Sequence, residues 1–376
     1  MRPSTTPSTS TSTPAARAAV TTTARVEHGG RPAPDEADRR RKHERVITLL
    51  ESRGAHSLIL RSAAAISWYL DGSRVHVSLA ADPIVAVVVS LDDAWLVATS
   101  NEVDRLRTEE LPDIRIVTVP WHTPIGSVLP SGHGVLEESE VAEGIRAVRA
   151  SLLPAEIARF RSLGREATTS LEALVEGVEE SWTERAVAAE AASGLVAAGI
   201  DPLVLLVAGS ERLAHRHPLP TEGELGARAM VVVCGRRDGL IVNVTRWFDA
   251  GGAPAEPFAS DMRRIRAVER AYLDATVPGA SLGGILRIGS AAYAEQGFAP
   301  DEWTKHHQGG AAGYAGRDPR ATPGATDEVQ LWQAFAWNPT APGVKVEETV
   351  LVTPSGLEVL TTSAAKAADV EAPVAG

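Results

Sequence analysis

The chain has 376 residues, of which 44% are apolar and 23% are charged, the composition of a soluble globular protein with room for two domains. Its formal net charge of −11 argues against nucleic acid or an anionic membrane as a partner. The single cysteine, Cys234, excludes an internal disulfide and a cysteine-rich zinc site, and is predicted to be a buried, inert thiol. Without a membrane-spanning stretch or a secretory signal, a cytoplasmic location is expected.

The first predicted domain is α/β and covers residues 36–153. Before it, residues 1–35 are rich in Ser, Thr, Pro and Ala and are predicted to be a disordered tail. The basic run at 39–45 is interpreted as the solvated start of an amphipathic helix rather than a nucleic-acid patch. A further helical pattern lies around 102–111. Apolar runs rich in β-branched residues predict strands at 57–62, 75–80, 84–91, 94–100 and 113–119.

The second predicted domain covers residues 154–363 and alternates helices with β-rich segments. A long helical stretch begins at Pro154 and reaches residue 199, and a helical pair is expected over 259–296. The β-rich segments lie at 203–209, 229–235, 239–248, 333–339 and 346–361. The last residues, 364–376, resemble the N-terminal tail in composition and are predicted to be disordered as well.

One motif is misleading: residues 279–283 read Gly-Ala-Ser-Leu-Gly, which matches the nucleophile elbow of serine hydrolases. That elbow needs a strand before it, and the preceding residues have a helical pattern, so Ser281 is predicted to be a helix N-cap. The sequence contains no P-loop, no G-x-G-x-x-G after a strand and no H-E-x-x-H.

Polar segments recur in the second half of the chain. Taken singly, each has an ordinary structural explanation, such as a turn at Gly309 and Gly310. Together, their order and spacing resemble the superfamily of creatinase, prolidase, aminopeptidase P and methionine aminopeptidase, over residues 40–362. The segments are HRHPLPTEGEL at 215–225, NVTR at 243–246, HHQGGAAGYAGRDPR at 306–320, AWNP at 336–339 and KVEETV at 345–350, with ISWYLDG at 66–72 as a looser match.

The resemblance implies an α/β fold whose C-terminal domain is a "pita-bread" domain, in which two α-β halves form a curved antiparallel sheet with helices outside. It also implies a homodimer in which the N-terminal domain covers the partner's pocket. Tyr69, Arg74 and His76 would then reach that pocket.

The metallopeptidases of this superfamily hold two divalent ions through two Asp, one His and two Glu. At the matching positions this chain has Val232, Asn243, Gly310, Asn338 and Glu347. Two adjacent divalent cations need several carboxylates to neutralise and bridge them, and only Glu347 supplies one. The resemblance therefore implies a pita-bread protein that lacks the two-metal centre, and no cofactor is expected.

The remaining polar residues at matching positions form a candidate site without metal. By resemblance to creatinase, His217 is a proton shuttle and Glu347 holds the cationic end of a substrate. Arg317 and Arg246 are expected to clamp a substrate carboxylate. Further substrate contacts are assigned to Asn243, Asn338, Gln308 and Tyr314.

His306 and His307 are further catalytic candidates, together with Asp318. Because successive side chains of an extended segment point to opposite faces, only one of these two histidines is expected to face the pocket. An alternative is one divalent metal ion held by His217, one of these histidines, Asp318 and Glu347.

The predicted function is metal-independent chemistry on a small, polar, nitrogen-containing substrate, most simply creatinase-like hydrolysis of a C–N bond. No nucleic acid or membrane partner is expected. Three alternatives stay open: a lyase, isomerase or cyclase that uses the same pocket, an Xaa-Pro-type metallopeptidase with a rebuilt mononuclear site, and a binding protein without catalysis.

Overall fold

The computed structural model describes residues 35–111, 113–252 and 255–362. The tails predicted at the two ends lie outside these ranges, apart from Asp35, whose side chain caps the first helix. The described residues form a mixed α/β fold, as predicted. None of the helices in these ranges is long and apolar enough to span a membrane.

Helix α1 (Glu36–Ser52) contains the basic run at 39–45, which was predicted to be solvated. That prediction is wrong for Lys42, whose side chain is fully buried. Its Nζ donates to Asp71 over 2.6 Å and lies 3.3 Å from a carboxylate oxygen of Glu156. A buried ammonium is tolerated here because carboxylates from distant parts of the chain neutralise it.

The N-terminal sheet has five strands in the order β4-β3-β2-β1-β5, with parallel pairs at β3–β4 and β1–β5 and antiparallel pairs between. Its strands are β1 (Ser57–Leu60), β2 (Val85–Ser90), β3 (Ala94–Thr99), β4 (Arg115–Val119) and β5 (Val135–Glu137). The helical segments are α2 (Ala63–Tyr69), α3 (Val103–Arg105), η1 (Leu106–Glu110), η2 (Ile125–Val128), η3 (Glu138–Val141) and α4 (Ala142–Ala150).

Four of the five strands predicted in this part of the chain are present, and the one predicted at 75–80 is not. Its alternating Val75, Val77 and Leu79 would share one face of a strand. Only Val75 is buried, whereas Val77 and Leu79 are 69% and 48% exposed. Without a buried face, the segment forms irregular turns.

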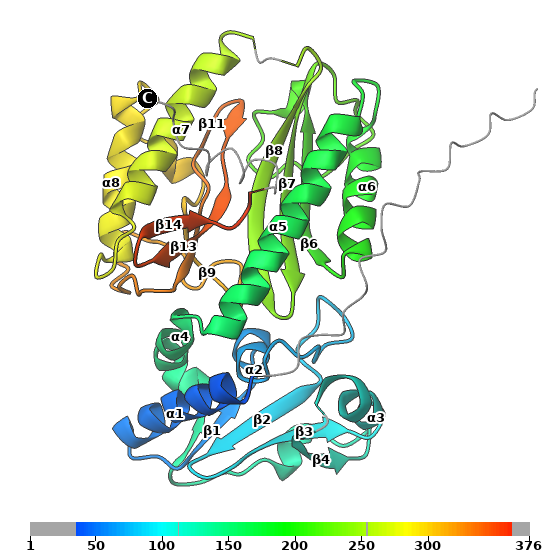
Figure 1. Ribbon diagram of the computed structural model, residues 1–376, viewed down its shortest axis with the longest axis vertical. Coiled ribbons are helices and arrows are strands. Elements are labelled where there is room, and N and C mark those ends of the chain that lie inside the picture. Colours follow the sequence, from blue (N-terminus) through cyan, green and yellow to red (C-terminus); the bar gives the residue numbers. More distant parts are fainter. Residues whose placement is uncertain (1–34, 112, 253–254, 363–376) are drawn as a thin grey trace, which may run out of the picture. The chain divides into compact units, whose positions relative to one another are not determined.

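The next part of the chain is an antiparallel three-stranded sheet in the order β6-β7-β8. Its strands are β6 (Asp201–Gly209), β7 (Arg228–Arg237) and β8 (Leu240–Asp249). The helices α5 (Pro154–Gly177) and α6 (Glu184–Ala197) precede β6, and the short η4 (Ser210–Arg212) lies between β6 and β7. Alternate residues such as Val231, Val233 and Val244 belong to the core shared with α5 and α6, which lie along this sheet (Figure 1). Cys234, Asn243 and the other alternate residues are left facing the opposite side.

A second antiparallel sheet has the order β14-β13-β10-β9 and packs against a helical pair, which Figure 1 shows beside it. The prediction of Ser281 as N-cap is confirmed, because its Oγ accepts a bond from Gly284 N. The elements are α7 (Phe258–Ala275), α8 (Leu282–Glu295), η5 (Glu302–Lys305), β9 (Gly309–Ala312), β10 (Ala334–Trp337), β11 (Thr340–Ala341), β12 (Val344–Lys345), β13 (Glu348–Thr353) and β14 (Gly356–Val359).

Hydrogen bonds join the two sheets where β8 meets the start of β13. The hydroxyl of Thr349 accepts from the backbone N–H of Asn243 over 2.8 Å and donates to the carbonyl of Asn243 over 3.0 Å. The N–H of Thr245 donates to the carbonyl of Glu347 over 3.1 Å. These bonds bring Asn243, Thr245 and Glu347 together although about a hundred residues separate them in the sequence.

Candidate functional site

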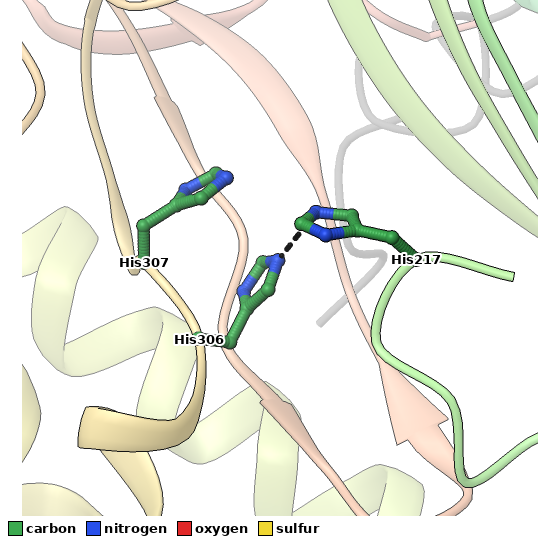
Figure 2. Close-up of side chains that lie close together, drawn as sticks. All are labelled: His217, His306 and His307. Carbon is green, nitrogen blue, oxygen red and sulfur yellow. Dashed lines mark hydrogen bonds between the residues drawn. The ribbon is translucent and has the colours of Figure 1, made fainter.

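Three histidines lie together at the centre of the candidate site (Figure 2). His217 comes from the loop between η4 and β7, and His306 and His307 come from the segment between η5 and β9. The Nε2 atoms of His217 and His306 are 3.1 Å apart and share a hydrogen bond. The rings of His306 and His307 stack with centroids 4.3 Å apart, and one ligand atom from each of the three residues lies within 4.8 Å of the others.

The expectation that only one of His306 and His307 faces the site is therefore wrong. It assumed an extended segment with alternating side chains. His306 has an extended backbone, but it caps the end of η5, and residues 306–308 belong to no strand, so the regular alternation of a strand does not apply to this pair. Both imidazoles consequently reach the same cluster as His217.

All three imidazoles are neutral at neutral pH. Burial lowers the pKa of His306 to about 2, with the neighbouring His307 and Lys345 acting in the same direction. Burial, followed by the guanidinium of Arg317, lowers the pKa of His307 to about 4. The pKa of His217 is also lowered, by burial and then by Lys345, although this side chain is the exposed member of the cluster. Neutral rings leave one nitrogen lone pair each for a proton or a metal ion.

Beside the histidines, Glu347 is held between two cations. Its Oε1 accepts from Nη2 of Arg317 over 2.7 Å, and its Oε2 lies 2.8 Å from Nζ of Lys345 and 3.3 Å from Oγ1 of Thr245. Burial raises the pKa of this carboxyl, but Lys345 and Arg317 outweigh burial and lower its pKa to about 2. Glu347 therefore stays ionised and is a poor proton acceptor.

Lys345 was not among the residues expected in the site. Its side chain is only 4% exposed and makes an ion pair with Glu347. The signal was present in the sequence, because residues two apart in an extended segment point to the same face. Lys345 stands two residues before Glu347, which resemblance alone had selected.

Several buried polar atoms of the site have no hydrogen-bond partner within the part of the chain that the structure describes. They are Nδ2 of Asn243, Nδ1 of His306, Nδ1 of His307, Nε of Arg317 and Oδ1 of Asn338. Buried polar groups in folded proteins are nearly always paired, so a concentration of unpaired ones indicates a place where a ligand binds. The predicted inert cysteine belongs to the same area: Cys234 Sγ donates to Oδ1 of Asn243 over 3.0 Å, and burial raises its pKa to about 12.

The pair of metal ions that the resemblance would bring does not fit these residues. Val232 is 1% exposed and packs in an apolar cluster with Leu206 and Met230. Asn243 and Asn338 offer neutral amides. The remaining carboxylate, Glu347, already has both oxygens engaged by protein donors.

Gly310, at the position of the histidine ligand, cannot accept a side chain without a shift of the backbone. Its φ is +145°, and a Cβ atom there would lie 2.4 Å from the carbonyl oxygen of Pro319 and 2.7 Å from the backbone nitrogen of Ala321. The close approach of the 319–321 segment to β9 thus occupies the space that a histidine would need.

Two predicted site residues are directed elsewhere. Asp318 accepts from Nε and Nη2 of Arg149 over 2.8 and 2.6 Å, both at Oδ2, so it is paired with Arg149 and is not part of the histidine cluster. Arg246 donates to Glu172 over 3.0 Å and to Glu348 over 2.7 Å. It alternates with Asn243 and Thr245 along β8, so it points away from the histidines and cannot clamp a substrate there.

Gln308 and Tyr314 are buried and bonded within the protein. Gln308 accepts from the hydroxyl of Tyr293 over 2.7 Å and donates to the carbonyl of His306 over 2.7 Å. Its role is therefore to hold the segment that carries the histidines. The hydroxyl of Tyr314 donates to Glu156 over 2.6 Å and belongs to the buried network around Lys42.

The three N-terminal candidates each have a partner in their own chain. The hydroxyl of Tyr69 lies 2.8 Å from Nδ1 of His43. Arg74 donates to Glu110 over 2.5 Å, and His76 Nε2 lies 3.0 Å from Nη2 of Arg236. Their role across a homodimer stays a prediction.

The comparisons with known proteins agree with this architecture. The model of metallopeptidase family M24 matches residues 158–354. The prolidase from Pyrococcus horikoshii is similar with a TM-score of 0.70 and 18% identity, covering 86% of this chain and 98% of its own. The dipeptidase PepE from Mycobacterium ulcerans is similar with a TM-score of 0.70 and 19% identity, covering 88% and 97%.

A third similar structure is the N-terminal domain of the FACT complex subunit SPT16 from Cicer arietinum, with a TM-score of 0.62, 12% identity and coverage of 86% and 96%. Among curated proteins, no sequence matches the chain. At these identities, the likeness to the solved structures shows the fold.

Proposed function

The chain belongs to metallopeptidase family M24, and we propose that it uses the fold of this hydrolytic family to cleave a C–N bond without a pair of metal ions. The substrate would be a small, polar molecule that contains nitrogen. The observation that carries the proposal is the cluster of three neutral histidines beside a buried carboxylate that two cations already neutralise. This set can transfer protons and bind polar groups, but it lacks the negative charge that two divalent ions need.

His217 is the acid–base residue in this proposal. It is the exposed member of the cluster, and its Nε2 is hydrogen-bonded to the buried His306, which fixes the orientation of its ring. In this step Nε2–H of His217 donates to His306, and water attacks the carbon of the scissile bond while Nδ1 of His217 takes the proton from the water. The C–N bond then breaks, and His217 returns that proton to the leaving nitrogen.

Arg317 and Lys345 would bind the polar end of the substrate. Two cations face one carboxylate, so this part of the site favours an anionic group, such as a carboxylate, over a cationic one. The unpaired Nε of Arg317 is a donor suited to such a group. The earlier expectation that Glu347 holds a cationic end is not favoured, because its oxygens accept bonds from the protein. Asn243 and Asn338 would orient the substrate through their unpaired amide atoms.

A peptidase that acts on Xaa-Pro substrates with one metal ion is the second candidate. It is supported by the approach of three imidazoles and by the likeness to prolidase structures. The two candidates differ in their response to chelation: the first keeps its turnover after metal removal, and the second loses it.

The test assays the chelator-treated full chain on small amidines, guanidines and cyclic amides that carry a carboxylate, with Xaa-Pro dipeptides alongside, and measures the release of ammonia or amine. His217→Ala should lower turnover by about 10²–10⁴-fold, the usual contribution of an acid–base group. His215→Ala is the matched control, since His215 is exposed and lies outside the cluster. Retained turnover in a folded His217→Ala variant would contradict the assignment, and turnover that requires added metal would favour the second candidate.

A further inference from the structure

One ring nitrogen from each of the three histidines points toward a common centre. Proton transfer by His217 alone does not require this arrangement. Figure 2 shows the rings of His217, His306 and His307 converging from two separate segments of the chain. We propose that these three histidines form a site for one late first-row transition-metal ion, such as Zn²⁺, with one ring nitrogen from each residue as ligand. This site is distinct from the five positions of the absent two-metal centre and uses none of them.

The distances support a single ion. In tetrahedral zinc sites, Zn–N bonds of about 2.0–2.1 Å place two ligand nitrogens about 3.3 Å apart. The Nε2 atoms of His217 and His306 are 3.1 Å apart, so an ion would take the place of the proton that they now share. The ligand atoms of all three residues lie within 4.8 Å of one another. Small rotations of the rings would bring these atoms to the spacing that a single ion requires.

The positions of the protons on the imidazole rings also allow a metal ion to bind. The buried Nδ1 atoms of His306 and His307 have no hydrogen-bond partner among the described residues. If Nε2 of both His217 and His306 binds the ion, each of these rings carries its proton on Nδ1. The change is a tautomer shift within neutral rings, and it costs one histidine–histidine hydrogen bond. His217 is exposed, so the ion can enter from solvent on its side.

The surroundings determine which ions bind. Hard cations such as Mg²⁺ are held by carboxylate charge, and here the neighbouring carboxylate, Glu347, is already paired with Arg317 and Lys345. Late transition-metal ions bind imidazole lone pairs and tolerate the absence of carboxylates better. Zn²⁺, Co²⁺ and Cu²⁺ should therefore bind, and Mg²⁺ should not.

Binding of such an ion has a functional consequence that rests on the proposed function. With Nε2 bound to the ion and the ring proton on Nδ1, His217 would have no lone pair left to accept the proton in hydrolysis. A transition-metal ion would thus inhibit this chain, whereas its family is named for metal-dependent peptidases. Inhibition and binding are separate observations, so a failure of one can be told from a failure of the other.

Calorimetric titration of the chelator-treated full chain with Zn²⁺ tests the site, and the visible absorption of added Co²⁺ reports imidazole ligation. We expect one ion per chain. His217→Ala and His307→Ala should each weaken binding at least about 100-fold, since loss of a ligand exceeds the ~10–100-fold cost of losing a residue behind a ligand. His215→Ala should bind like the unmodified chain, and thermal unfolding verifies that each variant is folded.

Absence of Zn²⁺ binding would overturn the proposed site, as would binding that His217→Ala leaves unchanged. Equal affinity for Mg²⁺ would also overturn it, since imidazoles would then not be the ligands. If Zn²⁺ binds through the histidines and inhibits turnover, both proposals are supported. If Zn²⁺ binds there and activates turnover, the metal site stands and the proposed metal-free hydrolysis fails.

Discussion

Glu347 lies at the position of one carboxylate ligand of the superfamily's metal centre, yet its charge is used inside the protein. Nζ of Lys345 and Nη2 of Arg317 each lie within 2.8 Å of one of its oxygens. The sequence reasoning found Glu347 and Arg317 by resemblance, and it missed Lys345. Which carboxylate pairs with which cation depends on side-chain contacts that a motif does not specify, so the cation-binding role of Glu347 stays a prediction that these ion pairs do not favour.

The ion pairs predict a specific order of stabilities. Glu347→Gln leaves two buried cations without a carboxylate and should lower the free energy of unfolding by about 3–5 kcal/mol. Lys345→Met should cost less, about 1–3 kcal/mol, because Arg317 still neutralises Glu347. Urea unfolding of both variants at neutral pH measures this difference. An unchanged free energy of unfolding in Glu347→Gln, or a larger loss in Lys345→Met than in Glu347→Gln, would contradict this role of the ion pairs.

Strand β9 shows what element-level reasoning could and could not predict. The long helices and the regular strands followed from apolar periodicity, and most of them are present. In contrast, Gly309 and Gly310 were read as a turn signal, and they form a strand with positive φ angles that is pressed against residues 319–321. A glycine that is required by close backbone contact looks the same in a sequence as a glycine in a turn.

The close contact of β9 predicts different effects of two glycine substitutions in the same segment. Gly310→Ala puts a Cβ 2.4 Å from the carbonyl oxygen of Pro319, so the backbone must shift, and we expect a loss of about 1–3 kcal/mol in the free energy of unfolding. Gly313→Ala is the matched control: its φ of +155° is also positive, but no atom lies within 4 Å of its Cβ position. Equal losses in the two variants would indicate that backbone conformation, and not contact with Pro319, determines the effect.

At the scale of the whole molecule, the family was predicted from the order of short polar segments, and the match to metallopeptidase family M24 confirms it. The division of the chain at residues 153 and 154 stays a prediction. Long-range contacts were not foreseen. The buried network of Lys42, Asp71, Glu156 and Tyr314 joins α1 and α5 to the loop that carries Arg317, and single-sequence patterns contain no signal for pairs so far apart.

We propose that this member of a metallopeptidase family does not hold two metal ions. Elemental analysis of the purified, untagged chain, after equilibration with excess Zn²⁺ or Mn²⁺ and removal of free ion, tests it most directly. We expect no more than one Zn²⁺ per chain, bound by the histidine cluster, and no retained Mn²⁺, because the carboxylates that a two-ion centre requires are absent. Two ions per chain would contradict the claim and would restore a dinuclear peptidase as the function of this protein.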